Sequence, residues 1–296
     1  MMTEHQVSQR QVCKAVGLPR STHQYKPVEK NDNEVVDALN QLVEKHPAIG
    51  FWQCFYRLRL AGHRWNHKKV YRVYTALQMN IRRRRKKRLP ARVKQALFQP
   101  SEANEVWSID FMCDSLWNGR KFRLLNIVDD FNREVLHIET DLSLPALRVI
   151  RVLEYLKLVR GLPKMIRVDN GPEFISHKLD AWCRENNITL VYIQPGKPTQ
   201  NAYVERFNGS IRRELLDAYI FYSLQDVRVK AEEWMTDYNL HRPHESLGNL
   251  PPVIFASRHS GGTQLYPQTA NENHSTIEES RLVDKAVCLS NEIDNF

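Results

Sequence analysis

The sequence predicts an α/β protein with a mixed five-stranded sheet and flanking helices, preceded by an all-α, helix-turn-helix-like region. From about residue 104, strand-like runs rich in Val, Ile and Leu follow one another and then alternate with helical patterns. Before residue 90, apolar residues recur at helical spacing instead. No stretch approaches the roughly 18 apolar residues of a membrane span, and the N-terminus has no apolar signal core. We therefore expect a cytoplasmic protein without a membrane partner.

The N-terminal part reads as short helices. Residues 7–25 predict two helices around a Gly-Leu-Pro break, and we assign residues 1–32 to a short N-terminal helical segment. Residues 34–44 predict a longer helix, because their apolar side chains fall on one stripe. Residues 49–62 predict the next helix, with Gly62 at its end.

A basic helix is expected after Gly62. Asn66 can cap it, and one of its faces shows Lys68, Lys69 and Arg72. A helix, a short turn containing glycine and a basic helix are the layout of helix-turn-helix DNA readers, and we assign residues 33–90 to such a region. Ordinary three-helix packing with solvated cations outside is the alternative.

Positive charge is concentrated in one part of the chain, whose net charge is +9. Residues 51–100 hold 15 Lys and Arg and no Asp or Glu, whereas residues 261–296 hold two basic and six acidic residues. A basic block of this density indicates a polyanionic partner, most often nucleic acid. The densest run predicts contacts to phosphates rather than a choice of bases, and it contains Arg82, Arg83, Arg84 and Arg85.

The second half predicts the sheet. Three strand-like runs, 106–112, 121–130 and 134–140, come first, with an Asn-Gly turn between the first two. The rest of the order is helix 144–159, strand 165–170, helix 177–186, strand 189–194, a helix within 195–215 and a helix over 225–240. We assign residues 91–103 to a linker, 104–258 to this α/β core and 259–296 to a polar, acidic tail that we expect to be disordered.

The helix within residues 195–215 carries an acid at a position that needs an explanation. At about 100° per residue, its polar stripe consists of Asn201, Glu205, Asn208 and Arg212. Glu205 then lies at the edge of the buried face, where a carboxylate without a partner is costly. It either pairs with Arg212 or another cation, or binds a metal ion.

Two further acids lie in predicted core strands, where acids are unusual. Asp110 interrupts the run "WSIDFM", and Asp169 ends "IRVD" before an Asn-Gly turn. If these strands are neighbours, both acids can approach Glu205. Three adjacent carboxylates must share protons or bind cations, and oxygen ligands favour Mg²⁺ or Mn²⁺. Taken singly, an acid in such a position is more often part of a salt bridge or a cap.

The text around these acids resembles a known family. Thirty-five residues separate Asp169 from Glu205, as in the D,D-35-E pattern of retroviral-integrase-type recombinases. The motifs "WSIDFM", "RVDNGPEF", "PGKPTQNAYVERFNGSIRREL" and "YNLHRPHESLGNLPP" resemble the OrfB-type DDE transposases of insertion sequence family three. The resemblance covers about residues 34–258.

This resemblance implies a ribonuclease-H-like catalytic core and DNA strand cleavage and strand transfer at the ends of an insertion sequence. It implies a catalytic triad of Asp110, Asp169 and Glu205 that binds Mg²⁺ or Mn²⁺, as two ions. It also implies double-stranded DNA as element end and target, an OrfA partner or an OrfA–OrfB fusion, a homo-oligomer in the synaptic complex, and association with the nucleoid. The DNA contacts expected near the site are Lys197, Asn201, Asn208 and Arg212.

Two other classes compete with this interpretation. A non-catalytic or decayed protein that only binds element ends could lose the acids, but all three are present. An RNA-directed nuclease could share the core fold, but a helix-turn-helix suits the major groove of B-DNA rather than A-form RNA. The sequence therefore favours the metal-dependent transposase.

Overall fold

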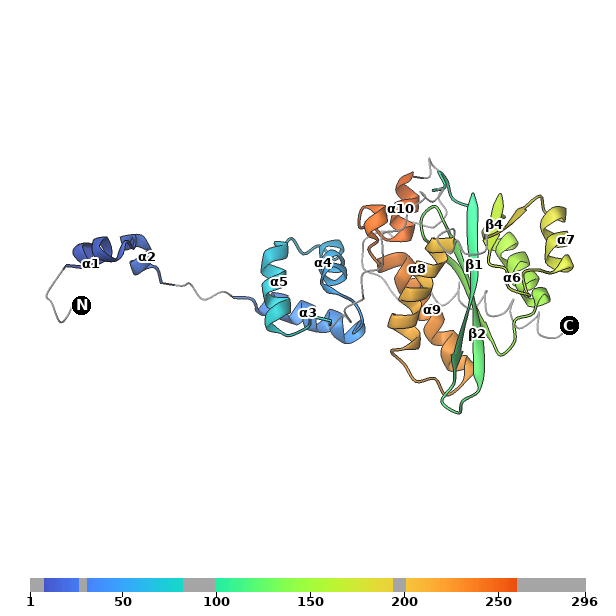
Figure 1. Ribbon diagram of the computed structural model, residues 1–296, viewed down its shortest axis with the longest axis horizontal. Helices are drawn as coiled ribbons and strands as arrows, with labels where there is room; N and C mark the ends of the chain where they lie inside the picture. Colours follow the sequence, from blue (N-terminus) through green and yellow to red (C-terminus); the bar gives the residue numbers. More distant parts are fainter. Residues whose placement is uncertain (1–7, 27–30, 82–98, 194–200, 260–296) are drawn as a thin grey trace, which may run out of the picture. The chain divides into compact units, whose positions relative to one another are not determined.

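The computed structural model describes residues 8–26, 31–81, 99–193 and 201–259 (Figure 1). Several of the predicted features lie outside these residues. They are the Arg82–Arg85 run, most of the linker, Lys197 and the tail from residue 260.

Short helices form the N-terminal part, as predicted. Helix α1 (Gln9–Val16) begins at a Ser8 capping box and ends at Gly17, whose φ of 68° is the left-handed conformation that glycine adopts without strain. Helix α2 (Arg20–Gln24) follows at once.

The next three helices share one apolar cluster. They are α3 (Asn33–Lys45), α4 (Phe51–Leu60) and α5 (His67–Ala76). The predicted cap is present, because the Asn66 side chain accepts a hydrogen bond from the Lys68 N–H at 2.9 Å. Gly62, at φ 95°, closes α4. The helix–turn–helix layout is thus confirmed as a fold.

A mixed five-stranded sheet forms the core, in the order β3-β2-β1-β4-β5. The strands are β1 (Val106–Ser115), β2 (Lys121–Asp129), β3 (Val135–Asp141), β4 (Met165–Val168) and β5 (Thr189–Tyr192). The pairs β1–β2 and β2–β3 are antiparallel, whereas β1–β4 and β4–β5 are parallel. An antiparallel meander continued by two parallel strands is the ribonuclease-H-like arrangement that the sequence predicts.

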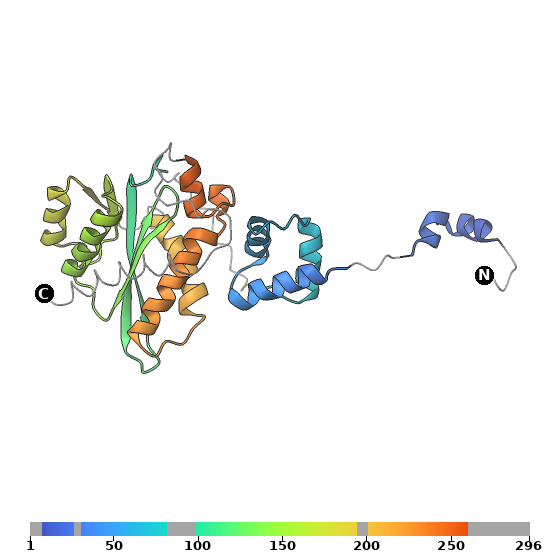
Figure 2. The same ribbon diagram turned by 180° about the vertical axis from the view of Figure 1, so that it is seen from behind.

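Helices cover both faces of this sheet (Figures 1 and 2). On one face lie α6 (Ala146–Val159) and α7 (His177–Glu185), and on the other lie α8 (Ala202–Ile211) and α9 (Leu224–His241). A π-helical turn at Arg212–Leu216 extends α8. The chain continues through a 3₁₀ turn (Glu245–Leu247) into α10 (Pro252–His259).

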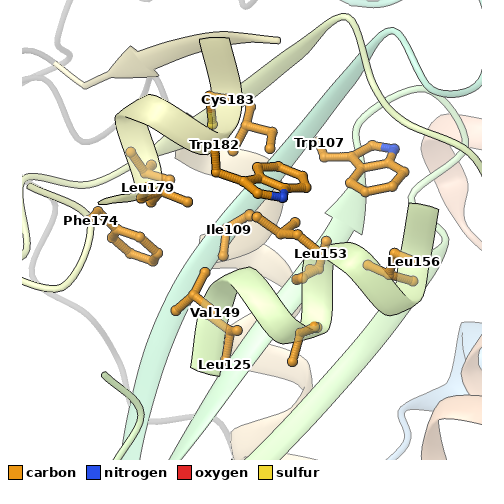
Figure 3. Close-up of a cluster of buried hydrophobic side chains, with 14 of the residues drawn as sticks. Trp107, Ile109, Leu125, Val149, Leu153, Leu156, Phe174, Leu179, Trp182 and Cys183 are labelled. Carbon is orange, nitrogen blue, oxygen red and sulfur yellow. The ribbon is translucent and has the colours of Figure 1, made fainter. Parts of the chain in front are cut away.

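Alternating side chains of β1 supply the two apolar cores. Trp107 and Ile109 point toward α6 and α7, where they meet Leu153 and Trp182 (Figure 3). Met112 belongs to the other core, beneath α8 and α9. The even-numbered residues of β1 therefore face α8. Among the described residues, no helix combines the length and apolar composition that crossing a bilayer requires.

The α3–α5 helices contact the core through α4. The Arg57 guanidinium forms a bidentate ion pair with Asp237 of α9, at 3.0 and 2.6 Å. The Gln53 amide donates a 2.8 Å hydrogen bond to the Pro243 carbonyl. The described residues up to Ala256 belong to one compact unit, so these contacts lie within it.

Buried ion pairs fix the turn that follows β2. Asp130 is fully buried and pairs with Arg167 of β4 at 2.6 Å. Glu134 pairs with Arg160, which follows α6, at 2.7 Å. These ion pairs connect the turn to β4 and to the C-terminal end of α6.

We predict that Arg167→Met destabilises the protein by about 3 kcal/mol, because it leaves the Asp130 carboxylate buried without its partner. Urea unfolding followed by circular dichroism measures this free energy. The control is Lys164→Met, which breaks a solvent-exposed pair with Glu102 and should change stability far less than Arg167→Met does. Equal effects of the two substitutions would contradict the assignment of Asp130–Arg167 as an anchor.

Candidate active site

Strand pairing brings Asp110 and Asp169 to adjacent positions. Ser108 of β1 pairs with Arg167 of β4 in parallel register. Each acid follows its paired residue by two positions on the same chain, so both stand at the same level of neighbouring strands. The sequence could not show whether the strands that carry or precede Asp110 and Asp169 are neighbours, and in the structure β1 and β4 are paired.

A chain of two amides connects Asp110 to helix α8. Asn126 of β2 lies directly opposite Asp110 in the β1–β2 register and is fully buried. Its amide donates a 2.7 Å hydrogen bond to Oδ1 of Asn208, and the Asn208 amide donates one of 2.7 Å to Oδ2 of Asp110. The Phe111 N–H donates to Oδ1 of Asp110 at 2.9 Å. The carboxylate is therefore held by one backbone and one side-chain donor.

Asp169 is held by the loop that follows β4. Its Oδ1 accepts a 3.1 Å hydrogen bond from the Gly171 N–H. A Cβ at position 171 would lie 3.0 Å from the same oxygen, a contact closer than side chains tolerate without a shift. The glycine of the "DNG" turn is thus what lets the backbone approach this carboxylate.

Glu205 is an exposed residue in the first turn of α8. Within the described part of the chain it forms no ion pair, and the predicted alternative of an Arg212 pair is not observed. Arg212 instead pairs with Asp114 of β1 at 2.6 Å and donates to the Cys113 carbonyl at 2.7 Å. Partial burial raises the pKa of Glu205.

The electrostatics of Asp110 show that the three acids interact. Burial, together with the charges of Asp169 and Glu205, raises the pKa of Asp110 to about 6, against the opposing effect of the hydrogen bonds from Phe111 and Asn208. In the described residues, however, no three acidic, His or Cys side chains lie at the spacing of metal ligands. Asp169 and Glu205 are close enough to raise the proton affinity of Asp110, but the three acids do not form a closed ligand set.

The predicted DNA contacts fall into separate places. Asn201 is buried at the start of α8, and Asn208 is engaged with Asp110. Lys68, Lys69 and Arg72 all lie on α5. There, Lys69 and Arg72 pair with Asp32, at 3.7 and 2.8 Å.

Asn126 is a site residue that the sequence reasoning missed. The signal was available, since it is a single amide inside the apolar run "RLLNIVD". The Asn118–Gly119 turn centres the hairpin so that Asn126 faces Asp110. Asp110 and Asn126 are polar residues at opposite positions of the predicted hairpin, and this pattern alone indicated a shared role.

Comparison with known proteins supports the predicted family. Two family profiles described as integrase core domain match residues 100–198 and 186–252. A protein of insertion element IS407 from Burkholderia multivorans is 41% identical over 254 residues, which span 86% of this chain and 92% of the relative. The chain belongs to the insertion-element transposases with an integrase core.

More distant matches of this transposase extend to named proteins. The putative transposase InsK of insertion sequence element IS150 from Escherichia coli is 25% identical over 84% of this chain and 93% of its own length. Among solved structures, the simian T-cell lymphotropic virus intasome in complex with a phosphatase regulatory subunit matches with a TM-score of 0.49 and 19% identity, over 80% of each chain. The family of this transposase is one of DNA transposition and integration, so the non-catalytic alternative is not favoured.

We predict that Glu205→Gln lowers the pKa of Asp110 below about 6, because it removes one of the two carboxylates that raise it. The folded pKa of Asp110 lies above its unfolded value of 3.8, so its contribution to stability is present at low pH and lost as the pH rises through about 6. The variant should lose less stability than the unchanged protein over that interval.

Carboxyl-carbon NMR titration of Asp110 and urea unfolding across the same pH range measure the two effects. Glu185→Gln, at the end of α7, changes the same charge away from the site and serves as the control. An Asp110 pKa unchanged by Glu205→Gln would show that the two carboxylates do not interact.

Proposed function

We propose that this transposase cleaves DNA strands at the ends of its insertion element and joins them to target DNA, with Asp110, Asp169 and Glu205 as a metal-binding triad. The observation that supports the proposal is the parallel β1–β4 register, which brings Asp110 and Asp169 to the same level. The pKa of Asp110, raised by burial and by the other two carboxylates, agrees with it. A partly buried carboxylate with two acidic neighbours is stabilised by a bound proton or by a bound cation.

The donor set fits a hard divalent cation. Each of the three side chains offers carboxylate oxygens, the ligands that Mg²⁺ and Mn²⁺ prefer. Bound there, two such ions would supply Lewis acidity, which activates the attacking oxygen and neutralises charge on the leaving oxygen. Since the acids do not lie at ligand spacing, we infer that they move together when they bind a cation.

The three acids differ in how firmly the protein holds them. Asp110 is held by Phe111 and Asn208, and Asp169 by the Gly171 N–H. Glu205 is exposed and forms no ion pair with the described residues. We infer that Asp110 and Asp169 form the fixed part of the site and that Glu205 completes it. Such positioning is what phosphoryl transfer mainly requires of a protein.

We further propose that α5 and the Arg82–Arg85 run bind DNA, as the density of positive charge suggests. The ion pairs of Lys69 and Arg72 with Asp32 are partly exposed, so DNA phosphates can replace Asp32 at little cost. Asn201 is buried and Asn208 is engaged with Asp110 in this structure. Arg212 is paired with Asp114, but this pair is partly exposed, so a DNA phosphate can replace Asp114, and Lys197 stays a candidate from the sequence. An OrfA partner, a homo-oligomeric synaptic complex and action at the nucleoid belong to the same proposal.

Glu205→Gln should abolish Mg²⁺-dependent cleavage of element-end DNA, by a factor of at least about 10², while DNA binding stays within about twofold. The substitution removes a cation ligand and keeps the volume of the side chain. Asp180→Asn, on the exposed surface of α7, is the matched control and should cleave normally. Cleavage by Glu205→Gln at the control's rate in Mg²⁺ would rule out Glu205 as a ligand.

Replacement of Arg82–Arg85 by alanine should reduce the slope of log affinity against log salt by roughly 3 to 4, because each phosphate contact on duplex DNA contributes about 0.9. Affinity should fall alike for element-end and unrelated duplexes. Fluorescence anisotropy at several salt concentrations gives both quantities. An unchanged slope would mean that these four arginines contact no phosphates.

A further inference from the structure

A cavity of about 670 Å³ lies behind helix α8, on the face turned away from Glu205. Tyr203, Arg206 and Ser210 of α8 line it, and at about 100° per residue these fall opposite the stripe that carries Glu205 and Asn208. Its volume is within the range of small-ligand sites, 300–1,000 Å³. The catalytic acids do not line it, so it is a second site on the same helix.

Arginines dominate the charge of this cavity. Arg133, Arg206 and Arg242 line it, against one carboxylate among the described lining residues, that of Glu245. Arg242 is already paired with Glu214. Arg206 is exposed and forms no ion pair with a described residue. The cavity therefore carries positive charge that the described part of the protein does not neutralise.

Arg133 is the strongest sign that a ligand belongs there. It is only 8% exposed, and its Nη1 is buried without a hydrogen-bond partner among the described residues. The guanidinium stacks on the Tyr203 ring, with Cζ 3.5 Å from the centroid. The stacking does not replace the hydrogen bond to water that Nη1 has lost, and a buried donor without an acceptor is costly. Nε2 of His244, also on the cavity wall, is buried and unpartnered in the same sense.

Aromatic rings contributed by α4 complete the lining. Trp52 and Tyr56 stack on each other with centroids 6.0 Å apart, and Trp52 is 56% exposed. The Arg57–Asp237 and Gln53–Pro243 contacts hold α4 against the core at this place. Unpaired cations beside exposed aromatic rings are the combination that binds single-stranded nucleic acid, with phosphates on the cations and bases stacked on the rings.

We propose that this cavity binds an unpaired nucleotide of a DNA strand, with its phosphate at Arg133 and Arg206 and its base against Trp52 and Tyr56. The inference rests on the proposed function only in taking DNA as the bound polymer. A duplex cannot enter a cavity of this size with its bases paired, whereas a frayed end or an overhang can. Because α8 carries Glu205 on its opposite face, such a contact would place the nucleotide on the helix that also carries the catalytic acid.

The experiment compares the affinity of the full chain for two duplexes, one blunt and one with about five unpaired nucleotides at one end. Fluorescence anisotropy with EDTA present keeps the measurement independent of cleavage. The unchanged protein should prefer the overhang. Arg206→Gln and Trp52→Leu should each reduce that preference by about tenfold, while affinity for the blunt duplex stays within about twofold.

Matched controls separate this effect from general loss of charge or of an aromatic ring. Arg184→Gln on α7 removes an exposed arginine, and Trp117→Leu removes an exposed tryptophan, both away from the cavity. Both controls should keep the overhang preference. The melting temperature of each variant confirms that it is folded.

Two results would overturn the proposal. One is an overhang preference that is absent, or is kept by both Arg206→Gln and Trp52→Leu. The other is stabilisation of the protein by inorganic phosphate or deoxyadenosine monophosphate as strong as that by a short single-stranded oligonucleotide, since that would indicate a site for free small anions. Failure of the triad proposal looks different, because it shows in the cleavage assay of Glu205→Gln and leaves the overhang result untouched.

Discussion

The hydrogen-bonded chain Asn126–Asn208–Asp110 is the constraint on which the site depends. It joins β2, α8 and β1 with two short bonds in a part of the core that is otherwise apolar. Buried amides and carboxylates are costly unless paired, so an α8 that shifted along the sheet would leave polar groups of the chain unpaired. The apolar side chains of α8 pack against the sheet, and this hydrogen-bonded chain fixes where along the sheet the helix lies. Two uncharged residues, Asn126 and Asn208, therefore fix the position of α8, and with it Glu205, relative to Asp110.

The same helix serves two surfaces because its buried stripe is narrow. Val204, Phe207 and Ile211 are almost fully buried, which leaves one side of the helix beside Asp110 and another beside the arginine-lined cavity. The β2–β3 turn, which buried ion pairs hold in place, also contributes Arg133 to the wall of the cavity. Its φ of 62° is unusual for an arginine. The same turn thus also carries the Arg133 guanidinium, one nitrogen of which has no hydrogen-bond partner among the residues that the structure describes.

Much of the fold followed from periodicity and turn residues. The strands, the α6 helix between Pro145 and Gly161, and the cap at Asn66 are local features, and local chemistry determines them. Of the candidate site, the three acids were predicted from their unusual positions and from the family resemblance, and their role stays a prediction. The sequence offered Arg212 as a partner of Glu205, but Arg212 pairs with Asp114 instead. This pairing could not be predicted, because it depends on how α8 lies on β1. The Arg133 cavity was missed for a similar reason, since its walls come from four separate segments of the chain.

The order of the acids along the chain has a consequence for synthesis in the cell. Asp110 lies on a strand that pairs first with its hairpin neighbour, but its parallel neighbour β4 is made only after α6, and Glu205 follows later still. Long-range parallel pairing is slow compared with hairpin formation, because a long loop must close before any contact compensates for its entropy. A nascent or truncated chain can thus hold a folded meander in which Asp110 still lacks both of its acidic neighbours. The three acids come together only when most of the chain has been translated and folded.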